Sequence, residues 1–362
     1  MRKETKAGLA ALCALAAGAG PGPQAAEVRE PQPSARAAPS APRPGQARVA
    51  AAEPERLEVA ERDRRGEDQT LLTFPEWFLV FSPEEMARAL ESGAPPSSLP
   101  WMAHVGQFWS SYWAANREIR ARGYGFNGGY HAMVMVIGVS TTVEYALRGL
   151  YESTMGRAFE FLFGHATPED RLEAAEARRY VDFIEGRPWY EFDFVAGVEK
   201  LWSSLPGESG WRAAPRRYER KVKLTAEWGA KAVYGWALGK AAAGAYEKPI
   251  FTSVSAVRGV DGSAALRELP RYQPFTKTAV ELSASGADFV SVAGNSGVIL
   301  VSILAPGAVE EPALGQRRLF EQSLPTRPGT RRLALLVTVG NLAELLRWAA
   351  RSGAQVEHVF DY

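Results

Sequence analysis

The feature of this sequence that most constrains its fold is a change in hydrophobic periodicity at Pro249. Before it, from residue 71 onward, apolar residues recur at three- and four-residue spacing, which is typical of amphipathic helices. After it, the sequence breaks into short β-rich runs separated by turn residues. We therefore predict a Trp-rich helical bundle domain at 71–248, followed by an α+β domain at 249–362.

The N-terminus has the pattern of an export signal. Three basic residues precede a short apolar run, Gly8–Gly20, and small residues follow it. This pattern predicts a signal peptide at 1–26 and a protein exported to the periplasm or cell envelope. The alternatives are an uncleaved membrane anchor and a lipoprotein site at Cys13, although a leucine precedes this cysteine where a lipoprotein signal has a small residue.

Residues 27–70 are dominated by Ala, Pro, Arg, Glu and Gly, with almost no aromatic or β-branched residues. Such a segment cannot bury enough apolar surface to offset its conformational entropy. We predict a disordered spacer here.

Charge and cysteine content exclude several classes of protein. Lys and Arg total 42 against 41 for Asp and Glu, so no basic surplus indicates nucleic-acid binding. Cys13 is the only cysteine and lies inside the signal, so the mature protein would have neither a disulfide nor a cysteine-ligated metal.

Capping and proline signals divide the bundle domain into helices. Ser82-Pro83-Glu84-Glu85 predicts a helix start, with the helix ending at about Glu91. The other predicted helices are at 101–122, 130–163, 167–185, 191–204 and 214–246. Asn127, in a glycine-rich turn, is placed near the start of the second of these.

The helix predicted at 130–163 is the most apolar one, but Ser140, Thr141, Thr142 and Glu144 interrupt it. An uninterrupted apolar run of about 20 residues would indicate a transmembrane helix. We interpret this segment as a central buried helix of the bundle, and a re-entrant or membrane-seated helix is the alternative.

The C-terminal domain has the pattern of a ferredoxin-like α+β sandwich. Its predicted strands are at 250–257, 289–293, 298–304, 318–323, 333–339 and 355–360. Its predicted helices are at 275–285 and 342–351, the second capped by Asn341, and Asn295-Ser296-Gly297 predicts a hairpin between the second and third strands. Units of this kind bind ligands, protein partners or copies of themselves, so the fold does not select a function.

Motifs of enzyme and metal sites are absent from the sequence: it has no phosphate-binding loop, nucleophile elbow, zinc helix or calcium loop. His104, His131, His165 and His358 have no spacing that places two ligands on one helix face. We therefore predict neither a metal nor a cofactor, and the sequence favours a non-enzymatic protein.

Glu144 is the strongest candidate for a functional residue because it interrupts the apolar helix. A buried carboxylate needs a partner, and Arg148 lies one turn away. The alternative is a general acid or base with a raised pKa. If the residue belongs to a ligand site, we expect a Trp-lined apolar groove that includes Trp109, Trp113, Tyr130 and His131.

Basic residues cluster in the segment 212–223. They include Arg216, Arg217, Arg220, Lys221 and Lys223. A basic run beside apolar, Trp-containing sequence is typical of contact with anionic lipid headgroups, and a solvated helix face is the alternative. Together these features predict an exported envelope protein that serves as a binding or assembly module. A protein partner, or self-association through the C-terminal domain, is the expected interaction.

Overall fold

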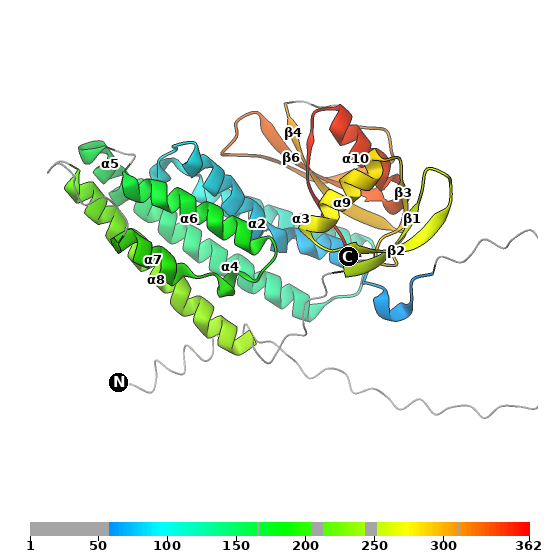
Figure 1. Cartoon of the computed structure of the whole chain (residues 1–362), viewed down its shortest axis with the longest axis horizontal. Helices are drawn as coiled ribbons and strands as arrows, with labels where there is room; N and C mark the ends of the chain where they lie inside the picture. The colour runs from blue at the N-terminus through cyan, green and yellow to red at the C-terminus, as the bar shows by residue number, and fades with distance from the viewer. Residues whose placement is uncertain (1–57, 165–166, 204–212, 243–251, 308, 310) are drawn as a thin grey trace, which may run out of the picture.

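The computed structural model describes residues 58–164, 167–203, 213–242, 252–307, 309 and 311–362, and it shows an α+β protein with the helices first (Figure 1). The predicted signal peptide lies outside the described residues. So do most of the predicted spacer, Arg212 and His165.

The first half of the protein is helical, as predicted. Its long helices are α2 (Gln69–Glu91), α3 (Trp101–Ala121), α4 (Gly128–Tyr151), α5 (Arg157–Phe163), α6 (Pro168–Ile184), α7 (Phe194–Ser203) and α8 (Ala214–Ala242). Short helical turns lie at η1 (Glu61–Asp63), η2 (Pro96–Ser98), η3 (Glu152–Gly156) and η4 (Trp189–Glu191). Asn127 accepts a hydrogen bond from the backbone N–H of Tyr130, and Thr167 forms a reciprocal capping box with Asp170. The sequence signals for these two helix starts were therefore read correctly.

The predicted helix start at Ser82 is wrong. One helix, α2, runs from Gln69 to Glu91 with Pro75 and Pro83 inside it. The Ser82 hydroxyl is hydrogen-bonded to the hydroxyl of Tyr145 at 2.8 Å and caps nothing. Proline inside a helix costs about 3 kcal/mol. Burial of the apolar residues of α2 against the neighbouring sheet and helices offsets this cost.

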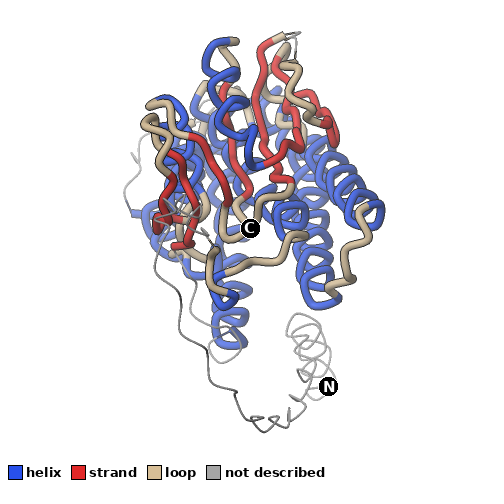
Figure 2. The backbone as a smooth tube through the Cα atoms, turned by 90° about the vertical axis from the view of Figure 1, so that its right-hand side faces the viewer, coloured by secondary structure: helices blue, strands red, loops and turns tan. Residues whose placement is uncertain are grey.

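The strands form two antiparallel sheets (Figure 2). The three-stranded sheet has the order β2-β1-β3, with β1 (Thr252–Arg258), β2 (Ala264–Pro270) and β3 (Asp288–Ser291). The four-stranded sheet has the order β5-β6-β4-β7, with β4 (Val298–Pro306), β5 (Arg317–Ser323), β6 (Thr330–Thr338) and β7 (Gln355–Phe360). Strand β2 is an exposed edge strand that our sequence analysis missed, because it contains no β-branched residue.

The topology meets the ferredoxin-like expectation only in part. In the four-stranded sheet, β6 and β7 flank β4 and are joined through α10 (Val339–Arg351), which is one split β-α-β unit. The predicted hairpin at Asn295 is wrong, because β3 and β4 belong to different sheets. The expected cap of α10 is also wrong: Thr338 occupies that position, and Asn341 Nδ2 donates to the carbonyl of Leu314 at 2.9 Å.

Both faces of the four-stranded sheet are covered by helices. Successive residues of β4 point to opposite faces, so Val301 packs toward α9 (Gln273–Ala284) and α10 while Leu300 packs toward α2. On the α2 side, Phe74 meets the ring of Phe360 at 5.4 Å between centroids. Helix α2 therefore contributes to the core of the C-terminal half as well as to the bundle.

Part of the predicted spacer is ordered. Residues 58–68 pack beside the connection between β3 and β4, where the N–H of Arg65 donates to the carbonyl of Ala293 at 3.1 Å. Asn295 Nδ2 returns a hydrogen bond to the carbonyl of Arg65 at 2.9 Å. The folded part of the chain therefore begins before the predicted boundary at residue 71.

Candidate functional site

Helix α8 carries charged residues on one side and buries that side. All but one of the steps between them are three or four residues, which places them on one face. They are Arg216, Glu219, Arg220, Lys223, Glu227 and Lys231. Arg216 and Arg220 have no exposed surface. The charged face of an amphipathic helix normally meets water, so the polarity of α8 is inverted.

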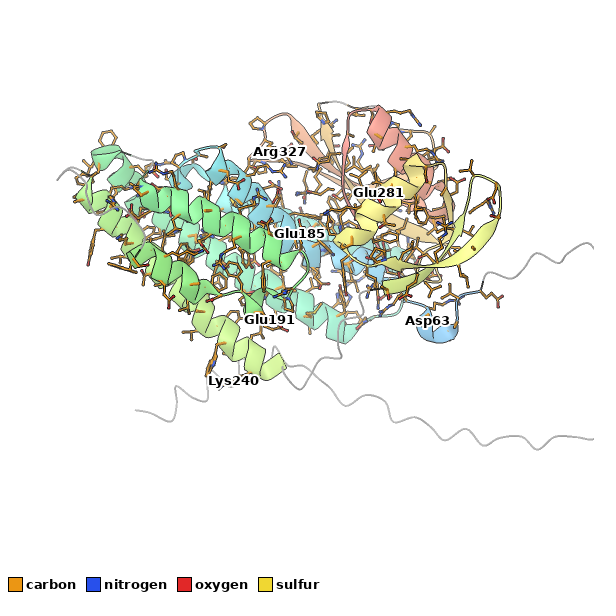
Figure 3. The ribbon with its side chains drawn as sticks, in the orientation of Figure 1. Asp63, Glu185, Glu191, Lys240, Glu281 and Arg327 are labelled. Atoms are coloured by element: carbon orange, nitrogen blue, oxygen red, sulfur yellow. The ribbon has the colours of Figure 1, made fainter. Side chains whose placement is uncertain are left out.

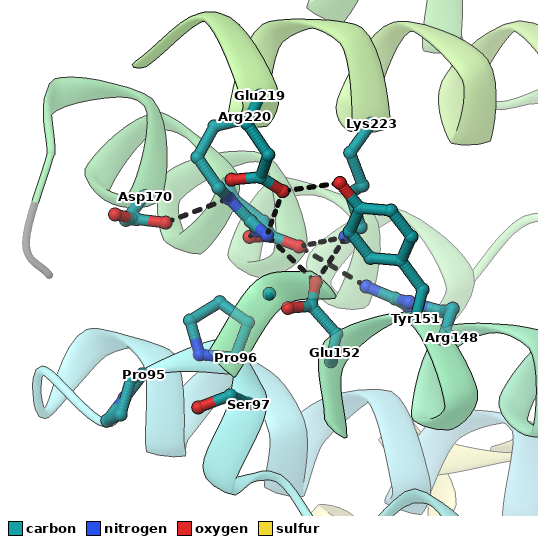
Figure 4. Close-up of polar contacts among 12 residues, drawn as sticks. Pro95, Pro96, Ser97, Arg148, Tyr151, Glu152, Asp170, Glu219, Arg220 and Lys223 are labelled. Atoms are coloured by element: carbon teal, nitrogen blue, oxygen red, sulfur yellow. Dashed lines mark hydrogen bonds and ion pairs between the residues drawn. The ribbon is translucent and has the colours of Figure 1, made fainter. Parts of the chain in front are cut away.

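Carboxylates from α6 and from the π-helical turn η3 face these cations inside the bundle (Figure 4). Arg220 contacts Glu152 Oε1 at 2.8 Å, Asp170 Oδ1 at 3.0 Å and also Glu173. Lys223 Nζ lies 2.9 Å from Glu173 Oε1 and 3.2 Å from Glu152 Oε1. We call the connected set the ionic network. Its members are Glu144, Arg148, Glu152, Glu160, Asp170, Glu173, Arg216, Glu219, Arg220, Lys223, Glu227 and Lys231.

The π-helical turn places Glu152 in the network. Turns of this kind are rare inside helices and are frequent at functional positions. Glu152 has no exposed surface, and a side chain at Gly156 would collide with its carboxylate. The sequence at this turn is therefore fitted to a buried anion.

The charges of the network are maintained by one another. Burial by itself would raise the pKa of Glu173, but Arg220, Lys223 and Arg148 hold that pKa at about 2. Glu227 likewise has a lowered pKa, in spite of its burial, because of Arg148 and Lys223. Burial opposes the charged form of Lys223 too, yet Glu173 raises its pKa. Glu173, Glu227 and Lys223 are therefore charged at neutral pH in spite of their burial.

A series of polar contacts, which we call the rungs, connects α4 to α8. Lys231 Nζ lies 2.7 Å from Glu144 Oε1, and Arg148 Nη2 lies 3.2 Å from Glu227 Oε1. Further along, the Tyr151 hydroxyl donates to Glu219 at 2.6 Å. Since the residue numbers rise on α4 as they fall on α8, the two helices are antiparallel neighbours, as Figure 1 shows.

A cavity of about 100 Å³ lies where α2, α4, α6, α7 and α8 converge. Its charged lining residues are Glu144, Arg148, Glu173, Glu176, Glu227 and Lys231, and its aromatic ones are Tyr145, Tyr180, Phe192, Phe194 and Trp228. Glu144 is 34% exposed and Lys231 20%, so this ion pair lies at the mouth. The cavity is charged and contains one tryptophan, unlike the Trp-lined apolar groove that we expected.

The outer faces of α4 and α8 are apolar. On α4 the exposed large side chains are Met135, Val139, Val143, Leu147 and Leu150, which are 38–65% exposed. On α8 they are Tyr218, Val222, Val233, Tyr234 and Trp236. The helical run 128–163 is the one described segment apolar and long enough to cross a membrane, yet only 28% of its most apolar window is buried. The interpretation of this segment as a central buried helix is therefore wrong.

The two apolar stripes face the same side of the molecule. At about 100° per residue, Val143 and Leu150 lie roughly 100° around α4 from Glu144, in the same rotational sense as Ala226 and Val233 lie around α8 from Glu227. Two antiparallel helices that contact each other through these residues are related by a twofold axis perpendicular to both helices. Residues with equal angular offsets on the two helices therefore point to the same side of the pair. We call this surface the α4–α8 face.

The residues predicted to form a ligand site with Glu144 do not gather around it. Trp109 Nε1 donates to Thr142 Oγ1 at 2.9 Å, and Trp113 is 52% exposed. The Tyr130 hydroxyl donates to Glu76 at 2.6 Å, and the His131 ring stacks on Phe126. None of these four lines the cavity. Glu144 itself is paired with Lys231 and with Arg148, at 3.5 Å, which matches the ion-pair interpretation of its role.

Four of the five residues predicted to contact lipid headgroups are buried. Arg216, Arg217, Arg220 and Lys223 are at most 9% exposed and contact carboxylates. Lys221 alone is partly exposed, with its ammonium 5.2 Å from the centre of the Trp202 ring. Three residues of the basic run, Arg216, Arg220 and Lys223, therefore belong to the ionic network. In the sequence, acidic and basic residues have the same helical spacing on α8. This spacing indicates that they have pairing partners elsewhere in the bundle.

The described residues contain no group of His, Cys, Asp and Glu arranged to hold a metal ion. Burial lowers the pKa of His104, and that of His358, to about 3, so both rings are neutral at pH 7. His104 is close to Arg332 and Glu85 at the boundary between the bundle and the sheet.

Comparisons of the chain with protein-family models, with curated proteins and with solved structures find no match. The class of protein is therefore argued from the inverted polarity of the bundle.

Proposed function

We propose that this is an exported envelope protein whose helical half is seated on a membrane through the α4–α8 face and acts there as a binding or assembly module. The observation that carries the proposal is the inverted polarity of the bundle. Charged residues fill its interior while large apolar residues cover one outer side. Ionisable residues in membrane-seated helices face inward and pair with one another in the same way.

Exposed apolar surface of this kind has an energetic cost in water. Each exposed Val or Leu forgoes about 1.5–3 kcal/mol of burial free energy. Val143, Leu147 and Leu150 on α4, with Val233 and Trp236 on α8, are each more than half exposed. Contact with hydrocarbon removes this cost, and monomeric soluble proteins seldom expose so continuous a patch.

The opposite side of the bundle favours a one-sided attachment over a span. The outer residues of α6 include Arg171, Arg178, Arg179 and Asp182, and Glu185 follows at its C-terminal end. Charged side chains in this number require water, so α6 faces the aqueous side. An apolar face opposite a charged one is typical of helices that lie in the plane of the membrane interface.

Side chains at the end of α8 fit an interfacial position. Lys240 extends from the C-terminal part of α8 (Figure 3), with its ammonium 4.0 Å from the centre of the Trp236 ring. Tryptophan and lysine anchor helices at the level of the headgroups. We further propose that the split β-α-β unit of the C-terminal half, the part of the ferredoxin-like pattern present here, is the part free to contact a partner.

Membrane flotation tests the proposal. Full-length protein mixed with phosphatidylcholine vesicles should float with them and resist a high-salt wash, because the contact is apolar. The double variant V139E/V143E should lose flotation, whereas A175E, which adds a carboxylate to the exposed face of α6, should float like the wild type. A wild-type protein that does not float with the vesicles, or a double variant that still floats, would overturn membrane seating.

Self-association of the protein through the same face must be distinguished from contact with lipid. Size-exclusion chromatography of the protein in detergent distinguishes the two. A monomer in detergent that floats with vesicles supports the proposal, whereas a stable dimer broken by V139E/V143E and indifferent to vesicles contradicts it.

A further inference from the structure

The cavity of the bundle has walls suited to a positively charged ligand. The carboxylates of Glu144 and Glu227 line it, and so do the aromatic rings of Tyr180, Phe194 and Trp228. Carboxylates attract an ammonium by charge, and aromatic faces attract it through their electron-rich rings. Pockets between the helices of a bundle are common ligand sites.

The protein places an ammonium of its own at this position. Lys231 Nζ is 2.7 Å from Glu144 Oε1, and it lies 5.6 Å and 5.7 Å from the ring centres of Tyr180 and Phe194. The combination of a carboxylate and two rings around one cation shows which chemistry the walls accept.

The position of Lys231 also allows it to give way. Its ammonium lies 3.8 Å from Glu227 as well, so a ligand at Glu144 leaves Lys231 with a carboxylate. The hydroxyl of Tyr180 lines the cavity and has no hydrogen-bond partner among the described residues, which leaves it free for an incoming group. The cavity volume of about 100 Å³ equals that of roughly three water molecules.

We propose that the cavity is a binding site for a small primary ammonium group, with Glu144 as its anion, Tyr180 and Phe194 as its aromatic walls and Lys231 as a tethered ammonium that closes it. Glu144 and Lys231, the partly exposed ion pair of the cavity, connect α4 to α8. A free alkylamine and the headgroup of an aminolipid both carry this ammonium. The lipid source rests on the proposed membrane seating, whereas the ammonium site itself does not.

Calorimetric titration of full-length protein with butylammonium chloride tests the site. The wild type should bind it, and E144Q should bind about tenfold more weakly or worse, because a charge-assisted hydrogen bond is lost. K221A is the matched control, since Lys221 contacts Trp202 and does not line the cavity, and it should bind like the wild type. Tetrabutylammonium should not bind because it exceeds the cavity.

Removal of the tethered ammonium gives the sharper result. K231A should bind butylammonium about tenfold more tightly than the wild type, since the competing charge is gone, and butylammonium should raise its unfolding temperature more than that of K221A. If K231A does not fold, the comparison of wild type with E144Q still decides. No binding to the wild type, or equal binding to E144Q, would overturn the site.

Vesicles separate the two sources of the ligand. Competition with butylammonium by phosphatidylethanolamine vesicles, and none by phosphatidylcholine vesicles, assigns the aminolipid. Butylammonium binding that neither vesicle affects assigns a free amine. Loss of flotation with amine binding intact would refute only the membrane seating.

Discussion

The two halves of this protein distribute charge in opposite ways. In the α+β half, the core between the four-stranded sheet and helices α9 and α10 is built from apolar side chains, among them Val301, Leu335 and Leu345, none of which is exposed. In the helical half, Arg220 and Glu152 are equally buried, while Leu147 is 63% exposed. The comparison shows that the amphipathic pattern of a helix identifies two faces but does not specify which of them is buried.

The difference changes what stabilises each half. An apolar core gains free energy as its surface leaves water. A buried ion pair gains little over an apolar pair of the same shape, but it is strongly destabilised when one partner is removed. The ionic network therefore fixes a specific arrangement of α4, α6 and α8, and the sheet core supplies the larger hydrophobic contribution.

The largest effect that we predict comes from Arg220→Met. The change leaves Glu152 and Glu173 short of a buried partner, and such losses cost about 3–5 kcal/mol. Denaturant unfolding of the full-length protein measures it. Lys221→Met, at the neighbouring, partly exposed position, should cost far less, and equal losses in the two variants would show that the network is not structural.

A matched pair of leucines gives the next effect. Leu335→Ala in the sheet core should cost about 2–5 kcal/mol of unfolding free energy, because it leaves a cavity. Leu147→Ala on the α4–α8 face should cost about 0.5 kcal/mol or less in the same measurement without lipid. A large loss for Leu147→Ala would place that residue in a core and remove the contrast between the halves.

The buried histidines and the buried carboxylates of the ionic network should respond to acid in different pH ranges. His358 has a folded-state pKa of about 3 against the usual 6.5, so its contribution is complete above pH 6.5 and is lost as the pH falls toward 3. Glu173, at about 2 against the usual 4.5, contributes fully above pH 4.5 and loses its contribution below that value. Each group accounts for about 1.4 kcal/mol per pH unit inside its range.

Unfolding followed as a function of pH tests this order. His358→Gln should make the dependence between pH 6.5 and 4.5 shallower, with His104 accounting for the slope that remains, and it should leave the loss below pH 4.5 in place. A wild-type protein whose stability is constant from pH 6.5 to 4.5 would contradict the burial of a neutral His358.

The smallest effect concerns a surface ion pair. Arg88→Ala removes a partner of Glu84, and exposed pairs contribute about 1 kcal/mol at most. Arg88 is 44% exposed, and Glu84 keeps Arg178 as a second partner. Unfolding free energy should thus change by less than for any buried variant above. A loss as large as that of Arg220→Met would mean that exposure does not separate the two kinds of pair.

Much of the secondary structure could be predicted from local signals. The cap at Thr167 and the turn at Asn127 act over a few residues, and both were read correctly. The helix start at Ser82 failed because the capping pattern there is overridden by packing of α2 on the sheet and by the hydrogen bond from Ser82 to Tyr145.

The candidate site was predictable only in part. Glu144 and its pairing with Arg148 follow from spacing along one helix. The contact with Lys231 and the cavity between five helices join segments far apart in the chain, and no local pattern specifies them. The basic run on α8 was visible in the sequence, but its burial was not.

By itself, the sequence determined the helical first half, the β-rich second half, the position of most elements and the amphipathic spacing along α8. These properties depend on backbone propensity and on side-chain periods within a few residues. The tertiary structure decided that the charged face of α8 is the inside, that the strands divide into two sheets, and that α2 belongs to both halves. The physical reason is that the free energy of a face depends on what packs against it, and that partner comes from elsewhere in the chain.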